Sequence, residues 1–146
     1  MKHIIQGTPI VAGTAEGKLL ASNEPLSFWG GYNQQTGEII DRRHPLSGQI
    51  AAGCVLAIPF TRGSSTTTAV LLEAVRCGKA PAAILTSNTD RFLALASIVA
   101  DEMYSKSLPV IVLEKTDFAF LQSGQHVIIT RFGKITLSIP ESMIIN

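Results

Sequence analysis

The sequence has little charge. Asp, Glu, Lys and Arg make up only 16% of its 146 residues, and twelve basic against eleven acidic side chains give a formal net charge of +1. Soluble domains usually contain about 25% charged residues. A nucleic-acid binder of this size usually has a clustered basic excess, and a disordered chain is rich in charge and poor in apolar residues. Neither class fits a chain that is 46% apolar. We therefore expect no nucleic-acid partner, and a surface that another protein partly covers.

Cysteines and long apolar runs are also scarce. Cys54 and Cys77 are the only cysteines, too few for a disulfide framework or for the three or four thiolates of an iron–sulfur cluster. The uncharged apolar stretch Ile50–Phe60 is far shorter than the roughly 20 residues that span a bilayer. The first residues also lack the apolar run of a signal peptide. We expect a cytoplasmic protein that has no membrane partner and binds no metal or cofactor itself.

The length suits one domain over residues 1–146. Apolar strand patterns and amphipathic helix patterns alternate in its middle, and a hairpin pattern around Gly133 follows. The expected elements, in chain order, are strand Cys54–Ile58, helix Thr66–Arg76, strand Ala82–Leu85, a helix from an Asp90 cap to about Tyr104, strand Pro109–Leu113, and strands His126–Thr130 and Lys134–Ile139. Short links between such elements favour a parallel sheet with right-handed crossovers. The sequence thus predicts an α/β fold with a central βαβαβ unit, additional β-strands such as Lys18–Ala21, and a C-terminal hairpin.

The segment between the first of these strands and the first helix is the most informative one for chemistry. Gly63 permits a sharp turn there, and the first amides of the helix, from Ser65 to Thr67, lack intrahelical partners. These amides and the helix dipole favour negative charge. Ser64 stands at the mouth of this site, where its hydroxyl could act as a base or bind a carboxylate or phosphate. The alternative is that Ser64 or Ser65 only caps the helix.

Three further residues are candidates for the same site. His44, which precedes Pro45, is a general acid or base or else a solvated loop residue. Arg62 binds an anion or is simply exposed, and Trp29 walls a pocket or packs under a loop. The sequence has no Ser/His/Asp set in a convincing arrangement, no HExxH motif and no paired carboxylates placed for acid–base chemistry. The chain alone therefore offers at most half an active site.

Several segments, in their order and spacing over roughly residues 5–115, resemble the small subunit of aconitase X, the swivel-domain polypeptide of that family of dehydratases. They are Leu26–Gly31, Thr36–Asp41, His44–Gly48, Arg62–Ser65, Leu72–Glu73 and Ala80–Ile84. The resemblance implies a swivelling β/β/α domain and a hydro-lyase that is active only with a large subunit. In the family, that large subunit carries the iron–sulfur cluster and most contacts to the hydroxy-acid substrate.

The resemblance also implies roles for single residues. Ser64 matches the serine that acts as the catalytic base in aconitases. Arg62, Gly63, Ser65 and Thr66 would support its alkoxide or bind substrate, while the partner's cluster would act as a Lewis acid toward the leaving hydroxyl. His44 and Trp29 would line the site. Thr66 stands where aconitases have an arginine that binds a substrate carboxylate, so citrate and isocitrate are not expected substrates.

Two reactions are known in the family, the dehydration of cis-3-hydroxy-L-proline and that of (R)-5-phosphomevalonate. The run Ser64–Thr68 is similar to the bacterial form, which favours hydroxyproline and leaves phosphomevalonate as the alternative. A non-catalytic module that binds an anion and regulates a partner is another hypothesis, and a self-sufficient serine hydrolase is a third. We expect the face around Trp29–Asn33, His44–Gly48 and Arg62–Thr67 to meet the large subunit.

Overall fold

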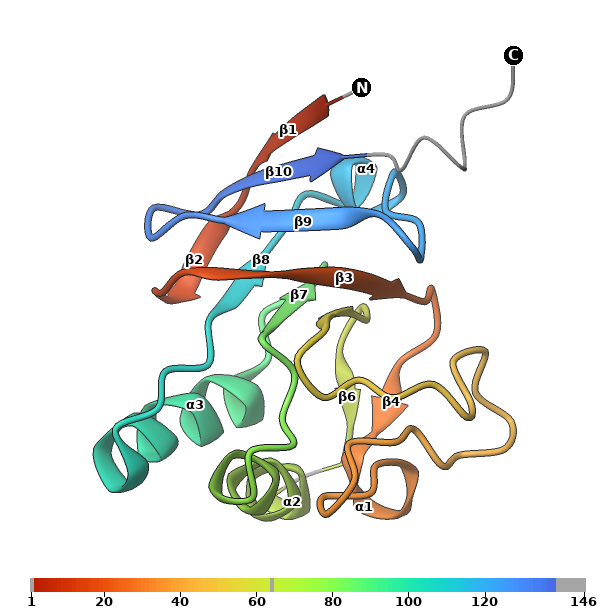
Figure 1. Cartoon of the computed structure of the whole chain (residues 1–146), viewed down its shortest axis with the longest axis vertical. Coiled ribbons are helices and arrows are strands. Elements are labelled where there is room, and N and C mark those ends of the chain that lie inside the picture. Colours follow the sequence, from red (N-terminus) through yellow and green to blue (C-terminus); the bar gives the residue numbers. More distant parts are fainter. Residues whose placement is uncertain (1, 64, 139–146) are drawn as a thin grey trace.

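Two β-sheets and a layer of helices lie on top of one another in the computed structural model, which describes residues 2–63 and 65–138 (Figure 1). The eight strands are hydrogen-bonded in the order β1-β10-β9-β3-β5-β7-β8-β2. Strand β3 belongs to both sheets, because it pairs with β9 along one edge and with β5 along the other. The outer sheet contains β1 (Lys2–Gln6), β10 (Lys134–Ser138), β9 (His126–Ile129) and β3 (Ala15–Ala21). The middle sheet contains β3, β5 (Val55–Ala57), β7 (Ala83–Thr86), β8 (Val110–Val112) and β2 (Thr8–Val11).

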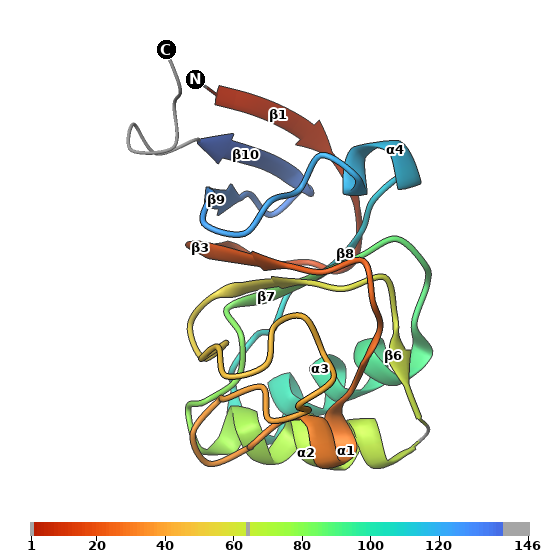
Figure 2. The ribbon, with the colours of Figure 1, turned by 90° about the vertical axis from the view of Figure 1, so that its right-hand side faces the viewer.

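The central βαβαβ unit is confirmed. Strands β5, β7 and β8 are parallel neighbours, and they are connected by the helices α2 (Ser65–Arg76) and α3 (Arg91–Tyr104). Both helices cover the same face of the middle sheet, as Figure 2 shows from the side. The Asp90 carboxylate accepts hydrogen bonds from the backbone amides of Phe92 and Leu93, which confirms the predicted cap of α3. The predicted C-terminal hairpin is also present, formed by the antiparallel β9 and β10.

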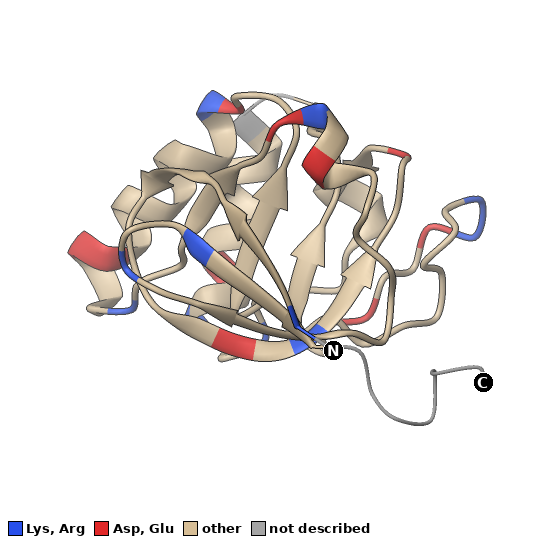
Figure 3. Ribbon diagram, turned by 90° about the horizontal axis from the view of Figure 1, so that it is seen from above, with Lys and Arg blue, Asp and Glu red and all other residues tan. Residues whose placement is uncertain are grey.

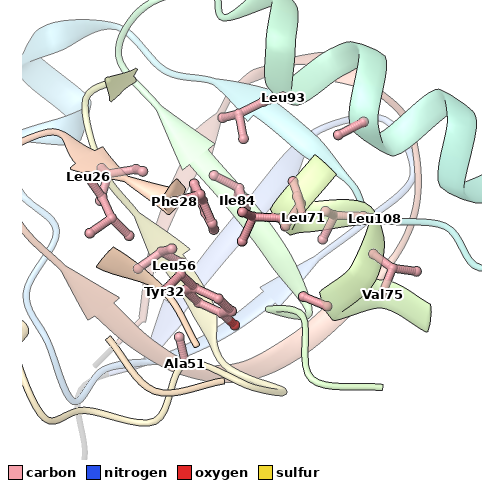
Figure 4. Close-up of a cluster of buried hydrophobic side chains, with 14 of the residues drawn as sticks. Leu26, Phe28, Tyr32, Ala51, Leu56, Leu71, Val75, Ile84, Leu93 and Leu108 are labelled. Atoms are coloured by element: carbon pink, nitrogen blue, oxygen red, sulfur yellow. The ribbon is translucent and has the colours of Figure 1, made fainter. Parts of the chain in front are cut away.

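Two hydrophobic cores hold the three layers together. Successive side chains of a strand point to opposite faces, and in β5 Leu56 faces the helices while Val55 and Ala57 face the outer sheet. A strand buried on both faces has no polar alternation, which explains the unbroken apolar runs of β5 and β7. Figure 4 shows the helix-side core, where Phe28 and Tyr32 pack beside Leu56 and Leu71.

The N-terminal segment differs from the sequence analysis, which assigns no strand to the first eleven residues. Strand β1 pairs with β10, and β2 pairs with β8, so the two strands border different sheets. Gly7 joins them in a narrow space, because a methyl group built on it would lie 2.4 Å from Cγ2 of Ile111. The segment therefore links the two sheets covalently.

The remaining elements are short. The two-stranded sheet of β4 (Leu26–Ser27) and β6 (Thr61–Arg62) is parallel, and it is followed on the β4 side by the single turn α1 (Phe28–Gly31). The last helix, α4, is the single turn Lys115–Phe118. The predicted single domain over residues 1–146 stays a prediction.

Candidate active site

The turn between β6 and α2 carries the predicted chemistry. Gly63 is exposed and has a φ of +116°, a conformation that side chains other than glycine rarely adopt. A methyl group built on Gly63 would make ordinary contacts, 3.5 Å from Oγ1 of Thr67 and 3.7 Å from Oγ1 of Thr66. Backbone conformation, and not lack of space, therefore requires glycine. The predicted base, Ser64, lies outside the described residues, as does the side chain of Ser65.

A buried carboxylate holds this turn in place. One oxygen of Asp90 accepts hydrogen bonds from the backbone amide of Thr61 at 2.8 Å and from its hydroxyl at 2.5 Å. The other oxygen caps α3 through the amides of Phe92 and Leu93. Asp90 thus ties β6, which leads into Gly63, to the start of the neighbouring helix. The sequence analysis found the cap but missed the bonds to β6, because the two partners are far apart in the chain.

Trp29 follows the strand that pairs with β6. The β4–β6 ladder places Leu26 opposite Thr61 and Ser27 opposite Arg62, so Trp29 and the Gly63 turn both follow the same end of this parallel ladder. The Trp29 side chain is 68% exposed. With Gly30, Tyr32, Asn33, Gln34, Gln35, Ile40 and Val70 it lines a pocket of about 500 Å³. The exposed Trp29 is not packed under a loop, and its place in the wall of an active site stays a prediction.

A second hollow includes residues of the turn itself. Its volume is about 350 Å³, and it is lined by Phe60, Thr61, Gly63, Asn88, Thr89, Asp90, Arg91 and Phe92. The first amides of α3 are already satisfied by Asp90. These amides are therefore not available to an anion, and at this edge the first amides of α2 are the ones that could bind it. Arg62, Thr66 and Arg91 are exposed around this helix end.

Tyr32 and His44 do not offer groups for proton transfer. The Tyr32 hydroxyl donates to the carbonyl of Lys79 at 2.7 Å, and burial raises the pKa of this phenol, with a smaller contribution from the Cys54 thiol. The His44 ring is 5% exposed. Its Nδ1 accepts from the amide of Leu46 at 3.1 Å, and its Nε2 lies 3.2 Å from the carbonyl of Glu24, to which it donates in that tautomer.

His44 is therefore not the solvated loop residue that one interpretation predicts. Both ring nitrogens bond to backbone groups, so neither is free for acid–base chemistry in this arrangement. The ring instead fixes the loop His44–Gly48 against the chain before β4. The prediction that His44 lines the site stays a prediction.

Neither a metal-binding cluster nor a membrane-spanning helix is present among the described residues. Residues 2–63 and 65–138 contain no group of three or more His, Cys, Asp or Glu side chains that could hold a metal ion. The described helices include none that is long and apolar enough to cross a membrane.

Comparison with known proteins identifies the family. Residues 4–137 match the family model described as the aconitase X swivel domain. The chain belongs to the aconitase X swivel-domain family. This chain is similar to a chain in the crystal structure of Thermococcus kodakaraensis aconitase X in its holo-form. The TM-score is 0.83 and the sequence identity is 29%, over 94% of this chain and 99% of that one. The β/β/α fold predicted by resemblance is thus confirmed.

Curated relatives of this swivel domain carry two names. It is 42% identical over 94% of its length to a cis-3-hydroxy-L-proline dehydratase of Hypocrea jecorina, and 50% identical over 76% to one of Pseudomonas aeruginosa. It spans only 23% and 19% of these two proteins. It is 37% identical over 84% of its length to a phosphomevalonate dehydratase small subunit of Thermococcus onnurineus, of which it covers 88%.

Proposed function

We propose that this swivel domain supplies the catalytic base, Ser64, to a cis-3-hydroxy-L-proline dehydratase. The observation that carries the proposal is the turn between β6 and α2, in which a glycine at φ +116° leads into the helix start where the family places its serine. The higher identities to the two hydroxyproline dehydratases, 42% and 50%, support this substrate over phosphomevalonate.

In the proposed reaction, the Ser64 alkoxide takes the proton from the carbon next to the substrate carboxylate, and water is lost. The backbone amides of Ser65 and Thr66 at the amino end of α2 would stabilise the alkoxide, together with the helix dipole. The exposed guanidinium of Arg62 would add positive charge beside it. The product is an unsaturated imino acid, which tautomerises or hydrolyses without further catalysis.

The rest of the active site would come from a large subunit. The swivel domain spans about a fifth of the two hydroxyproline dehydratases, and the relative that it covers at 88% is itself named a small subunit. Figure 3 shows Lys, Arg, Asp and Glu scattered over the ribbon, with neither sign gathered in one place. The face that we propose for the partner includes the exposed residues Trp29, Arg62, Gly63 and Thr66.

The residues of this chain do not fit an iron–sulfur cluster. The thiol of Cys54 contacts the carbonyl of Ile50, and that of Cys77 contacts the carboxylate of Glu73, so the only two cysteines face different groups on different elements. We propose that the cluster implied by the family lies on the large subunit. The cytoplasmic location stays a prediction.

Phosphomevalonate is the second candidate substrate. The observation that favours it is length, because this chain and the Thermococcus onnurineus small subunit match over 84% and 88% of their respective lengths. The anion-binding helix start would suit the carboxylate of either substrate.

The test is an assay of the complex with its large subunit on both substrates. Ser64→Ala should lower kcat by about 10²- to 10⁴-fold, the usual contribution of a positioned general base. Ser87→Ala, which changes another serine at the same edge of the sheet, is the matched control and should keep full activity. Activity of Ser64→Ala within tenfold of the unsubstituted complex would contradict the base assignment. A complex that turns over neither substrate would favour the regulatory module.

A further inference from the structure

Three consecutive threonines in the first turn of α2 have different surroundings. Thr66 is exposed. Thr68 is half-buried, and its hydroxyl donates to the carbonyl of Phe92 at 3.3 Å, which ties α2 to α3. Thr67 is 0% exposed. Exposure to solvent accounts for Thr66 and the hydrogen bond to Phe92 accounts for Thr68, but neither accounts for Thr67.

The Thr67 hydroxyl has no hydrogen-bond partner among the described residues, and its Oγ1 atom is buried. Such groups are rare, because burial removes the hydrogen bonds that water would make. A valine would fill the same volume without this cost. A threonine at this position therefore needs a reason other than packing.

The direction of the hydroxyl suggests that reason. Thr67 is the third residue of α2, and its Oγ1 lies 3.5 Å from the place that a methyl group on Gly63 would occupy. The hydroxyl thus lies beneath the turn and at the amino end of the helix, where the dipole already favours an anion. A donor in this buried position interacts more strongly with a charged oxygen than an exposed donor would.

We propose that the Thr67 hydroxyl donates a hydrogen bond to the oxygen anion that forms at the amino end of α2 in the assembled enzyme. On the proposed function, on which this inference rests, that anion is the Ser64 alkoxide. Thr67 is then a positioning residue that acts through the serine base. It favours the ionised form of the base, and the lack of a partner for its hydroxyl among the described residues is the cost of this role.

A purely structural role makes a different prediction. In a capping box, the side chain of the third helical residue reaches back to accept from the amide before the helix. Loss of such a cap would lower the thermal stability of the protein and leave the pH dependence of catalysis unchanged. Stability and pH profile together therefore separate the two roles.

The experiment compares Thr67→Val, Thr67→Ser and the control Thr68→Val in the complete enzyme with its large subunit. We measure kcat, KM, the pH profile of kcat and Tm. Thr67→Val should lower kcat by about 10- to 100-fold, as expected for a hydrogen bond to a charged group, with little change in KM. The acid limb of the profile should move up by about one to two pH units, because the base loses a group that favours its ionised form.

The same variant should keep or raise Tm, since it removes a buried hydroxyl that bonds to no residue the structure describes. Thr67→Ser should restore kcat and the pH profile, and Thr68→Val should change neither. If Ser64→Ala is inactive but Thr67→Val has a normal kcat and a normal pH profile, this inference alone is overturned. A Thr67→Val variant with a lower Tm and an unshifted pH profile would overturn it as well. Activity of Ser64→Ala within tenfold of the unsubstituted enzyme, or an unsubstituted complex without turnover, would overturn the proposed function and this inference with it.

Discussion

Replacing Asp90 by alanine tests whether one buried carboxylate organises the site. The substitution removes the cap of α3, which is worth about 1 kcal/mol. It also leaves the backbone amide of Thr61, a residue that is 8% exposed, without its acceptor, at a cost of about 1–3 kcal/mol. The sum is about 2–4 kcal/mol. For a domain of this size, that loss lowers Tm by roughly 5–15 °C.

Thermal unfolding followed by circular dichroism measures this loss, and two further variants divide it. Asp90→Asn keeps one acceptor oxygen but turns an NH₂ group toward either Thr61 or the amides of α3, so about half of the loss should remain. Thr61→Val removes only the hydroxyl bond to Asp90 and should cost about 1 kcal/mol. The kcat of the complex should fall with Asp90→Ala, because β6 leads directly into Gly63. A Tm within 2 °C of the unsubstituted protein, or a Thr61→Val variant as unstable as Asp90→Ala, would refute this reasoning.

Two other substitutions separate folding from assembly. His44→Ala should lower the free energy of unfolding by about 2–3 kcal/mol in urea titrations, because it leaves the amide of Leu46 and the carbonyl of Glu24 without partners; an unchanged unfolding midpoint would contradict the structural role of the ring. Trp29→Ala should leave Tm unchanged and weaken binding of the large subunit by at least about tenfold in calorimetric titrations, since exposed tryptophans often dominate interfaces. Phe132→Ala, at an 81% exposed position in the turn between β9 and β10, is the control and should bind normally, and equal binding by both variants would refute the proposed face.

The middle of the fold could be predicted because its signals are local. β5 and β7 are buried on both faces, and α2 and α3 have one apolar face each, so periodicity alone locates them. Strands β1 and β2 lack such a signal. They are edge strands, and in β1 only Ile5 is buried. Their pairing depends on strands formed much later in the chain.

The candidate site was predictable only in part for the same reason. The Gly63 turn is marked by residues that are neighbours in sequence. The bonds from Asp90 to Thr61 and the burial of His44 and of the Thr67 hydroxyl depend on tertiary contacts. A sequence pattern shows that Asp90 caps a helix, but it cannot show that the second carboxylate oxygen accepts hydrogen bonds from Thr61 in β6.

The segment from Lys2 to Val11 has a consequence for biosynthesis. His3 pairs with Leu137 and Thr8 pairs with Val112, so strands made early by the ribosome must wait for partners made late. Until then, the backbone groups at both free edges of the nascent sheets stay unpaired, and such edges attract other chains. Folding of this domain should therefore finish only after β10 has been synthesised, because β1 has no partner strand before then.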